Sequence, residues 1–175
     1  MNRQRYPNLP LLIVDDEPSW LRSLSLSLRG AAGINHVLQC LDSREVMGVL
    51  AEQQVSLVLL DLTMPHLSGQ DLLKMIAEEH PEIPVIILTG MNRLETAVEC
   101  MKQGAFDFYV KTGEEERLLA GVRRALGVFE LRRENSALRK RVFLDDLVNP
   151  GAFSAIVTRS PKMEALFLYA EAVAP

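Results

Sequence analysis

Five short apolar segments alternate with longer segments of helical periodicity between positions 11 and 110, and this alternation restricts the fold more than any other feature of the chain. The apolar segments read LLIV, HVLQC, SLVLL, VIILT and FDFYV, beginning at Leu11, His36, Ser56, Val85 and Phe106. Several are apolar at nearly every position, which is typical of parallel strands covered by helices on both faces. The pattern predicts an α/β fold with a doubly wound parallel sheet of five strands.

Helices are expected in the intervals between these strands. We place them over about 18–30, 43–54, 69–80, 92–103 and from about 114 onward. Plausible stops come from Gly30, Gly33, Pro81, Pro84 and Gly104. Ser43 and Asn92 are expected to cap the second and fourth of these helices.

Composition excludes several classes of protein. The chain is 48% hydrophobic and 24% charged, and no apolar run approaches the roughly 20 residues that cross a bilayer, so no membrane segment is expected. The N-terminus lacks the apolar core of a secretory signal, which makes a cytoplasmic location the expectation. The two cysteines, Cys40 and Cys100, predict neither a disulfide framework nor a zinc site. A net charge of -4 gives no general attraction to nucleic acid.

Acidic side chains stand at the ends of two predicted strands. Asp15 and Asp16 follow the first strand, and Asp61 follows the third. One carboxylate could simply cap the helix that Pro18 is suited to open. The carboxyl ends of parallel strands lie at one edge of the sheet, however, where three carboxylates repel one another unless a cation is present. An all-oxygen site of this kind suits Mg²⁺.

A hydroxyl and an ammonium group are predicted at the same edge. Thr89 ends the fourth strand and Lys111 follows the fifth. Phosphoryl transfer to an aspartate needs a nucleophilic carboxylate, a cation and donors for the phosphoryl oxygens. The strand ends together predict this chemistry.

With these motifs, positions 9 to about 125 resemble a receiver domain of a two-component response regulator. The resemblance rests on the paired acids, on D-L-T-M-P-x-x-x-G from Asp61, on Thr89 and on Lys111. It implies the flavodoxin-like strand order 2-1-3-4-5, a regulatory phosphoacceptor rather than an enzyme, Mg²⁺ as cofactor and a sensor histidine kinase as partner.

The resemblance also implies a role for each matching residue. Asp61 is the phosphoacceptor, and Lys111 pairs with the phosphate. Asp16 and Asp61 bind Mg²⁺ directly, Thr63 offers it a backbone carbonyl, and Asp15 acts through water. Thr89 is the switch hydroxyl and Phe108 the switch aromatic. Each has an ordinary structural alternative: Thr89 as a helix cap, Phe108 as a core residue and Lys111 as a solvated loop charge.

The chain departs from the receiver pattern after Lys111. In receiver domains a proline follows this lysine across a cis peptide bond, whereas here Thr112 and then Gly113 follow it. A cis bond before a non-proline residue costs roughly 2.5–4 kcal/mol, so we expect a trans bond, with Gly113 absorbing any unusual backbone angle. The departure leaves a second hypothesis, a pseudo-receiver that binds partners without phosphorylation. A third, a flavodoxin-like cofactor binder, lacks a phosphate loop after the first strand.

The segment from Glu114 is longer than one helix needs to cover a sheet. A seam with the 3-4 spacing of a coiled coil runs through Val128, Leu131, Asn135, Leu138 and Val142. A buried Asn135 would fix register and favour a homodimer, whereas the alternative is a surface helix with a solvated asparagine. The basic run LRRENSALRKR reads as surface charge of this helix, so no direct nucleic-acid binding is expected.

We therefore predict a receiver domain over 1–127, a linker helix with a dimeric coiled-coil seam over 128–148, and a tail over 149–175. The tail resembles the opening of the central ATPase domain of NtrC-type sigma-54-dependent activators, which regulate transcription. No G-x-x-x-x-G-K-[ST] motif occurs, so no ATPase activity is expected from these residues. ATPase and DNA-binding output domains are expected only in a longer protein.

Overall fold

The computed structural model describes residues 5–90, 94–113 and 115–144, with 163, 166 and 167, and the side chains of the last long helix up to residue 136. Its internal contacts divide the chain into two units, Met1–Glu130 and Leu131–Pro175. The sheet belongs to the first unit. In the second, residues 163, 166 and 167 are helical, and the rest of the predicted tail lies outside the described residues.

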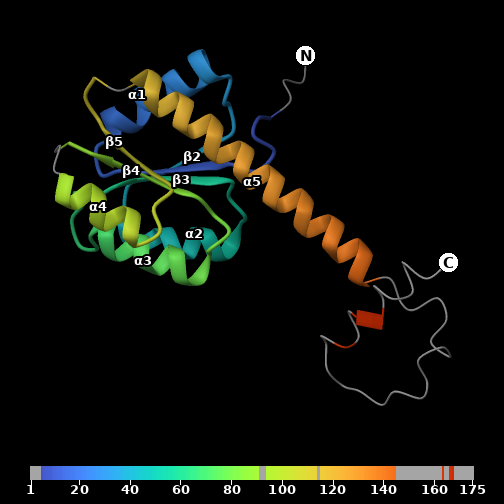
Figure 1. The fold of residues 1–175 in the computed structure, drawn as a ribbon. Coiled ribbons are helices and arrows are strands. Elements are labelled where there is room, and N and C mark those ends of the chain that lie inside the picture. The colour runs from blue at the N-terminus through green and yellow to red at the C-terminus, as the bar shows by residue number, and fades with distance from the viewer. Residues whose placement is uncertain (1–4, 91–93, 114, 145–162, 164–165, 168–175) are drawn as a thin grey trace. The chain divides into compact units, whose positions relative to one another are not determined.

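One parallel sheet contains all five strands, in the order β2-β1-β3-β4-β5 (Figure 1). The strands are β1 Leu11–Val14, β2 Val37–Cys40, β3 Leu57–Asp61, β4 Val85–Thr89 and β5 Asp107–Val110. Every residue of β1, β3 and β4 is buried, whereas the edge strands β2 and β5 keep partly exposed positions. The predicted doubly wound sheet and its flavodoxin-like order are therefore confirmed.

Helices cover both faces of this sheet. They are α1 Pro18–Ala32, α2 Val46–Glu52, α3 Gly69–Glu79, α4 Leu94–Lys102 and α5 Glu115–Leu144, with a 3-10 turn η1 over Ser43–Glu45 before α2. Figure 1 shows α1 and the start of α5 on one face and α2, α3 and α4 on the other. The helix predicted from about position 114 corresponds to α5, which runs over Glu115–Leu144.

Each face has its own hydrophobic core. On the first face, the buried side chains of α1 and α5 pack on the sheet; they include Leu21, Leu24, Leu28, Leu118, Val122 and Leu126. On the second face, those of α2, α3 and α4 do so; they include Val46, Leu50, Leu72, Ile76 and Cys100. Cys40 and Cys100 are both buried free thiols. Burial of both faces fixes the strands, and with them the side chains at their carboxyl ends.

The boundaries of α1 follow the sequence signals. Pro18 opens the helix, and Gly33 ends it with a φ of 70°, a left-handed conformation that glycine adopts without steric cost. The cap predicted at Ser43 is wrong: the side chain of Asp42 accepts the Arg44 N–H instead. The cap predicted at Asn92 lies outside the described residues. None of the described helices combines the length and apolar character of a membrane span.

Candidate functional site at the carboxyl ends of the strands

The parallel register brings the predicted site residues to one edge of the sheet. Asp15 comes directly after β1, Asp61 and Thr89 end β3 and β4, and Lys111 comes directly after β5. The backbone N–H of Lys111 donates to the Thr89 carbonyl at 2.8 Å, which extends the pairing of β4 with β5 by one residue. The ends of four strands are thus placed at one edge of the sheet, as the sequence predicted.

Three carboxylates form a candidate cation site. Asp15, Asp16 and Asp61 each offer one oxygen, and these oxygens lie within 4.8 Å of one another. Asp15 and Asp61 are buried, whereas Asp16 is exposed. The Oδ1 atom of Asp61 is buried and has no hydrogen-bond partner among the residues described. Closely spaced carboxylates with an unpartnered oxygen fit a hard, oxygen-binding cation.

Burial raises the pKa of Asp61, because a carboxylate is less stable away from water. The ammonium of Lys111 opposes this shift, and the negative charge of Asp15 adds to it. The upward direction prevails, so the charged form of Asp61 is disfavoured in the folded protein. A bound cation relieves this cost.

Lys111 contacts two of the three acids. Its Nζ lies 2.7 Å from Asp15 Oδ2 and 3.3 Å from Asp61 Oδ2, and its side chain is only 12% exposed. Burial alone lowers the pKa of a lysine, but the hydrogen bond to Asp15 and the charges of both acids outweigh it and raise the pKa of Lys111. Lys111 is therefore a protonated, paired cation, unlike a solvated loop charge.

The capping alternative accounts for only part of the acidic cluster. Asp15 Oδ1 accepts the Glu17 N–H at 3.0 Å just before α1 begins. Its Oδ2 faces Lys111 instead. Since Asp61 belongs to β3, capping of α1 explains one oxygen of Asp15 and no contact of Asp61.

The loop between β3 and α3 depends on Gly69. A Cβ atom at this position would collide with the carbonyl oxygen of Asp61 and lie 2.6 Å from the Leu62 Cα. The backbone N–H of Gly69 also donates to the Leu62 carbonyl at 3.2 Å. The glycine of the D-L-T-M-P-x-x-x-G motif thus lets α3 start directly against the strand that ends in Asp61.

Ser43 supports the same loop, a role that sequence reasoning missed. Its hydroxyl donates to the Pro65 carbonyl at 3.1 Å and accepts the Leu67 N–H at 3.3 Å. The side chain is 2% exposed. Thr63, the predicted carbonyl ligand, is exposed in this loop. A serine before a helix normally indicates a cap, so no local signal reveals a contact made 22 residues away.

The loop after Lys111 has the backbone expected from its sequence. The only cis peptide bond in the described chain is Tyr6–Pro7, so the Lys111–Thr112 bond is trans, as predicted. Gly113 has a φ of 79° and open space around the position of a Cβ. Gly113 thus takes up the left-handed turn of this loop.

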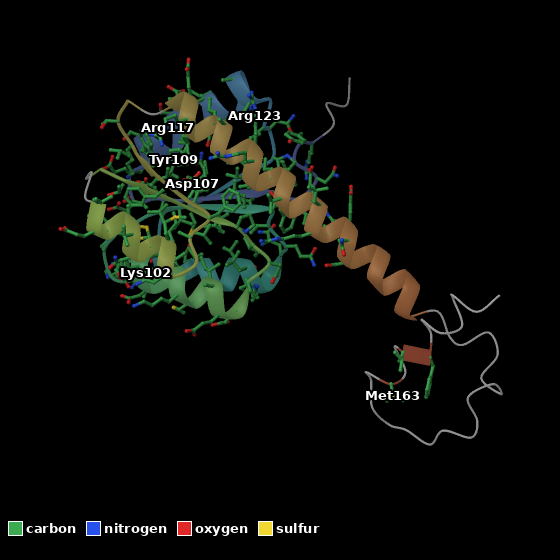
Figure 2. All side chains as sticks on the ribbon, viewed as in Figure 1. Lys102, Asp107, Tyr109, Arg117, Arg123 and Met163 are labelled. Atoms are coloured by element: carbon green, nitrogen blue, oxygen red, sulfur yellow. The ribbon has the colours of Figure 1, made fainter. Side chains whose placement is uncertain are left out.

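Two neighbouring aromatic residues of β5 face opposite sides of the sheet. Phe108 is half-buried against the α2–α4 face, and Tyr109 is buried against α5. The Tyr109 hydroxyl donates to Asp107 Oδ2 at 2.7 Å and accepts from Arg124 Nη2 at 3.1 Å. Figure 2 shows Asp107 and Tyr109 beside Arg117 of α5, whose guanidinium lies 5.7 Å from the tyrosine ring. These contacts bind β5 to α5.

The predicted seam lies on helical backbone throughout, within α5. Val128 is half-buried, Asn135 is exposed and Leu131 is 68% exposed. The side chains of Leu138 and Val142 lie outside the described residues. The seam therefore stays a prediction.

The sheet order, the acids after β1 and β3 and the lysine after β5 together define a doubly wound α/β domain with an acidic cluster at the carboxyl edge of its sheet. A family model described as the response regulator receiver domain matches residues 11–123. The chain belongs to this family, whose members act in two-component signalling.

Curated relatives agree with this assignment. The nitrogen assimilation regulatory protein NtrX of Azorhizobium caulinodans is 36% identical over 135 residues, covering 74% of this chain and 29% of that protein. The DNA-binding transcriptional regulator NtrC of Salmonella typhimurium is 36% identical over 121 residues, covering 67% of this chain and 25% of that protein. The predicted resemblance to NtrC-type regulators is confirmed, and the chain spans less than a third of the length of these two relatives.

Solved structures show the same fold. The beryllofluoride-activated NtrC4 receiver domain dimer superimposes with a TM-score of 0.63 at 32% identity, covering 69% of this chain and 98% of that one. NtrX from Brucella abortus gives a TM-score of 0.65 at 28% identity, covering 93% of this chain and 40% of that one.

Proposed function

We propose that Asp61 accepts a phosphoryl group from the phosphohistidine of a sensor histidine kinase. The observation that most supports this role is the buried ammonium of Lys111, which lies within 3.3 Å of carboxylate oxygens from Asp15 and Asp61 at the edge of the sheet. A fixed positive charge beside a carboxylate stabilises the charge that develops on a phosphoryl group in transfer.

The transfer is a displacement at phosphorus. An oxygen of Asp61 forms the new P–O bond, the P–N bond to the kinase imidazole breaks, and that imidazole leaves with the bonding electron pair and takes up a proton. The unpartnered Oδ1 of Asp61 is suited to the attack because it has no hydrogen bond to lose within the described structure. Lys111 stays protonated and neutralises charge on the product.

Asp16 and Asp61 would hold Mg²⁺ directly, with the Thr63 carbonyl as a further ligand and Asp15 acting through water. The donor set is entirely oxygen, as Mg²⁺ prefers, and the three carboxylates lie close enough to share one ion. When bound, Mg²⁺ supplies positive charge toward the phosphoryl oxygens.

Phosphorylation would act on the faces around β4 and β5. Thr89 is 2% exposed at the end of β4 and would close on the phosphoryl group, while Phe108, half-buried on β5, would turn as the switch aromatic. β5 is bound to α5 through the Arg124 contacts to Asp107 and Tyr109. A change at β5 thus has a direct route to α5.

The output would be a change in a homodimer formed along α5. The exposed Leu131 supports a partner helix on the seam, since a large apolar side chain gains stability when covered. In a longer protein this change would control an ATPase of the sigma-54 activator type and a DNA-binding domain, and through them transcription.

Intact-protein mass after incubation with acetyl phosphate and Mg²⁺ tests the phosphoacceptor. We expect one phosphoryl adduct that is labile in base, absent in Asp61→Asn and retained in Glu79→Gln, an equivalent carboxylate-to-amide change at an exposed residue that ends α3. No adduct on the wild-type chain, together with no beryllofluoride binding, would instead support the pseudo-receiver hypothesis.

Mass measurement in solution tests the seam. The chain that ends at Gly127 should be monomeric where the full chain is dimeric. Asn135→Leu makes every position of the seam apolar and should preserve association while relaxing its register. An unchanged dimer in the truncated chain contradicts the proposed seam.

A further inference from the structure

Trp20, the only tryptophan in the sequence, lies beside Lys111 although 91 positions separate them in the chain. It belongs to the first turn of α1, which begins at Pro18 just after the acids. The Lys111 Nζ lies 5.5 Å from the centroid of the indole. Tryptophan is the aromatic side chain that attracts a cation most strongly, and this distance is within the range of a cation–π contact.

Other contacts of Trp20 leave the orientation of its ring only partly fixed. The side chain packs against the core formed by α1 and α5, and it is half-buried. Its Nε1 is buried without a hydrogen-bond partner among the described residues. The residue also lines a cavity of about 430 Å³ shared with Ser23, Ser27 and Lys111, so part of its surface borders space instead of protein.

Lys111 needs an orienting contact because its own loop provides little. A lysine side chain has four rotatable bonds, and Thr112 and Gly113 are exposed. The backbone hydrogen bond to Thr89 fixes the backbone of Lys111 but does not orient its ammonium. Asp15 and Asp61 pair with the ammonium, and the indole lies beside it as a third group.

We propose that Trp20 is a positioning residue for Lys111, holding the ammonium over the two acids where a phosphoryl group arrives. This inference rests on the phosphoacceptor function proposed above. An aromatic face suits the task better than a third carboxylate, because it attracts the ammonium without adding negative charge that would repel the phosphoryl oxygens. The contact from α1 thereby orients Lys111 in a loop that has no proline to fix its backbone.

The test compares Trp20→Leu, which removes the π face, with Trp20→Phe, which keeps a weaker one. We expect phosphorylation by acetyl phosphate and Mg²⁺ to slow about three- to tenfold in Trp20→Leu and less in Trp20→Phe. Mg²⁺ affinity should be unchanged in both, since no carboxylate is altered. Leu26→Ala, a change at a residue of α1 that is 69% exposed, serves as the control and should phosphorylate at the wild-type rate.

A second measurement reads the contact itself. In the unphosphorylated protein, NMR resonances of the Lys111 ε-methylene group should be shifted upfield by the indole ring current, and Trp20→Leu should abolish the shift. A wild-type rate in Trp20→Leu overturns the proposal, as does a slower rate with unmoved Lys111 resonances, which would indicate packing alone.

Two further outcomes are equally decisive. If Trp20→Leu does not fold, the wild-type NMR resonances and the phosphorylation rate of Trp20→Phe decide the question. A folded wild type without the ring-current shift excludes the contact. If the wild type takes up no phosphoryl group, the proposed function fails, whereas the Lys111 resonances still decide whether Trp20 holds the ammonium.

Discussion

The loops that follow β3 and β5 place two opposite charges, and they do so by different means. After Asp61 the chain is held by backbone hydrogen bonds, by the buried hydroxyl of Ser43 and by the close approach of Gly69 to the strand. After Lys111 the chain is exposed, and a left-handed Gly113 has open space around it. The carboxylate is therefore positioned by its backbone, and the ammonium by the side chains around it.

The largest effect on stability is expected in the loop between β3 and α3. Gly69→Ala should lower the free energy of unfolding by about 3 kcal/mol, because the added methyl group meets the Asp61 carbonyl and the Leu62 backbone, which cannot move aside cheaply. Urea unfolding followed by circular dichroism measures the change. An unaltered midpoint would show that the β3–α3 loop yields easily and would remove the contrast with the β5–α5 loop.

A smaller loss is expected from the serine that holds this loop. Ser43→Ala should cost about 1–2 kcal/mol, because the Pro65 carbonyl and the Leu67 N–H lose the serine hydroxyl and keep only their hydrogen bond to each other. The same urea experiment measures it. Ser23→Ala, at an exposed position in α1, is the matched control and should stay within about 0.5 kcal/mol of wild type. Equal effects of the two substitutions would count against a supporting role for Ser43.

In the loop after β5, backbone strain is the only cost of adding a side chain at Gly113. Gly113→Ala should destabilise by about 1 kcal/mol, since its φ of 79° is unfavourable for alanine although no atom is in the way. Gly113→Asn should lose less, because asparagine tolerates the left-handed region. If Gly113→Ala proves as costly as Gly69→Ala, the two loops do not differ in the way proposed.

The final prediction is that Asp61→Asn is more stable than the wild type at neutral pH. The pKa of Asp61 is raised in the folded state, mainly by burial, so the folded protein binds this proton more tightly than the unfolded chain. Stability contributed by Asp61 is thus lost as pH rises from its ordinary pKa of 3.8 through the folded-state value. Without Mg²⁺, Asp61→Asn should therefore unfold at higher urea than wild type at pH 7.

The pH profile of this difference provides the check. The advantage of Asp61→Asn should shrink as pH falls and vanish below 3.8, where Asp61 is protonated in both states. Glu79→Gln, at an exposed position, should show no such profile. A difference that stays constant with pH would mean that the ionisation of Asp61 is not its source.

The sheet and its charged edge could be predicted from the sequence because both follow from local patterns. Fully apolar runs predict buried parallel strands, and residues directly after such strands must lie at one edge, which places Asp15, Asp61 and Lys111 together. Thr89 joins them for the same reason. The order of strands came from the resemblance to receiver domains, since alternation alone does not fix it.

Contacts between distant segments could not be predicted in this way. Nothing near Ser43 indicates that its hydroxyl holds Pro65, and nothing near Trp20 indicates Lys111. The alternation in β5 likewise does not reveal that the Tyr109 hydroxyl bonds to Arg124. Such pairs depend on how helices rotate over the sheet, which the packing of whole side chains decides.

Four separate strands contribute to the site, and this has a consequence for how the protein comes into use. Asp15 follows the first strand along the chain and Lys111 the last, so the site does not exist until β5 has joined β4. A nascent or partly unfolded chain has the acids without their ammonium. Under the proposed function, a molecule in which β5 is not paired with β4 would lack the complete site and could not accept a phosphoryl group.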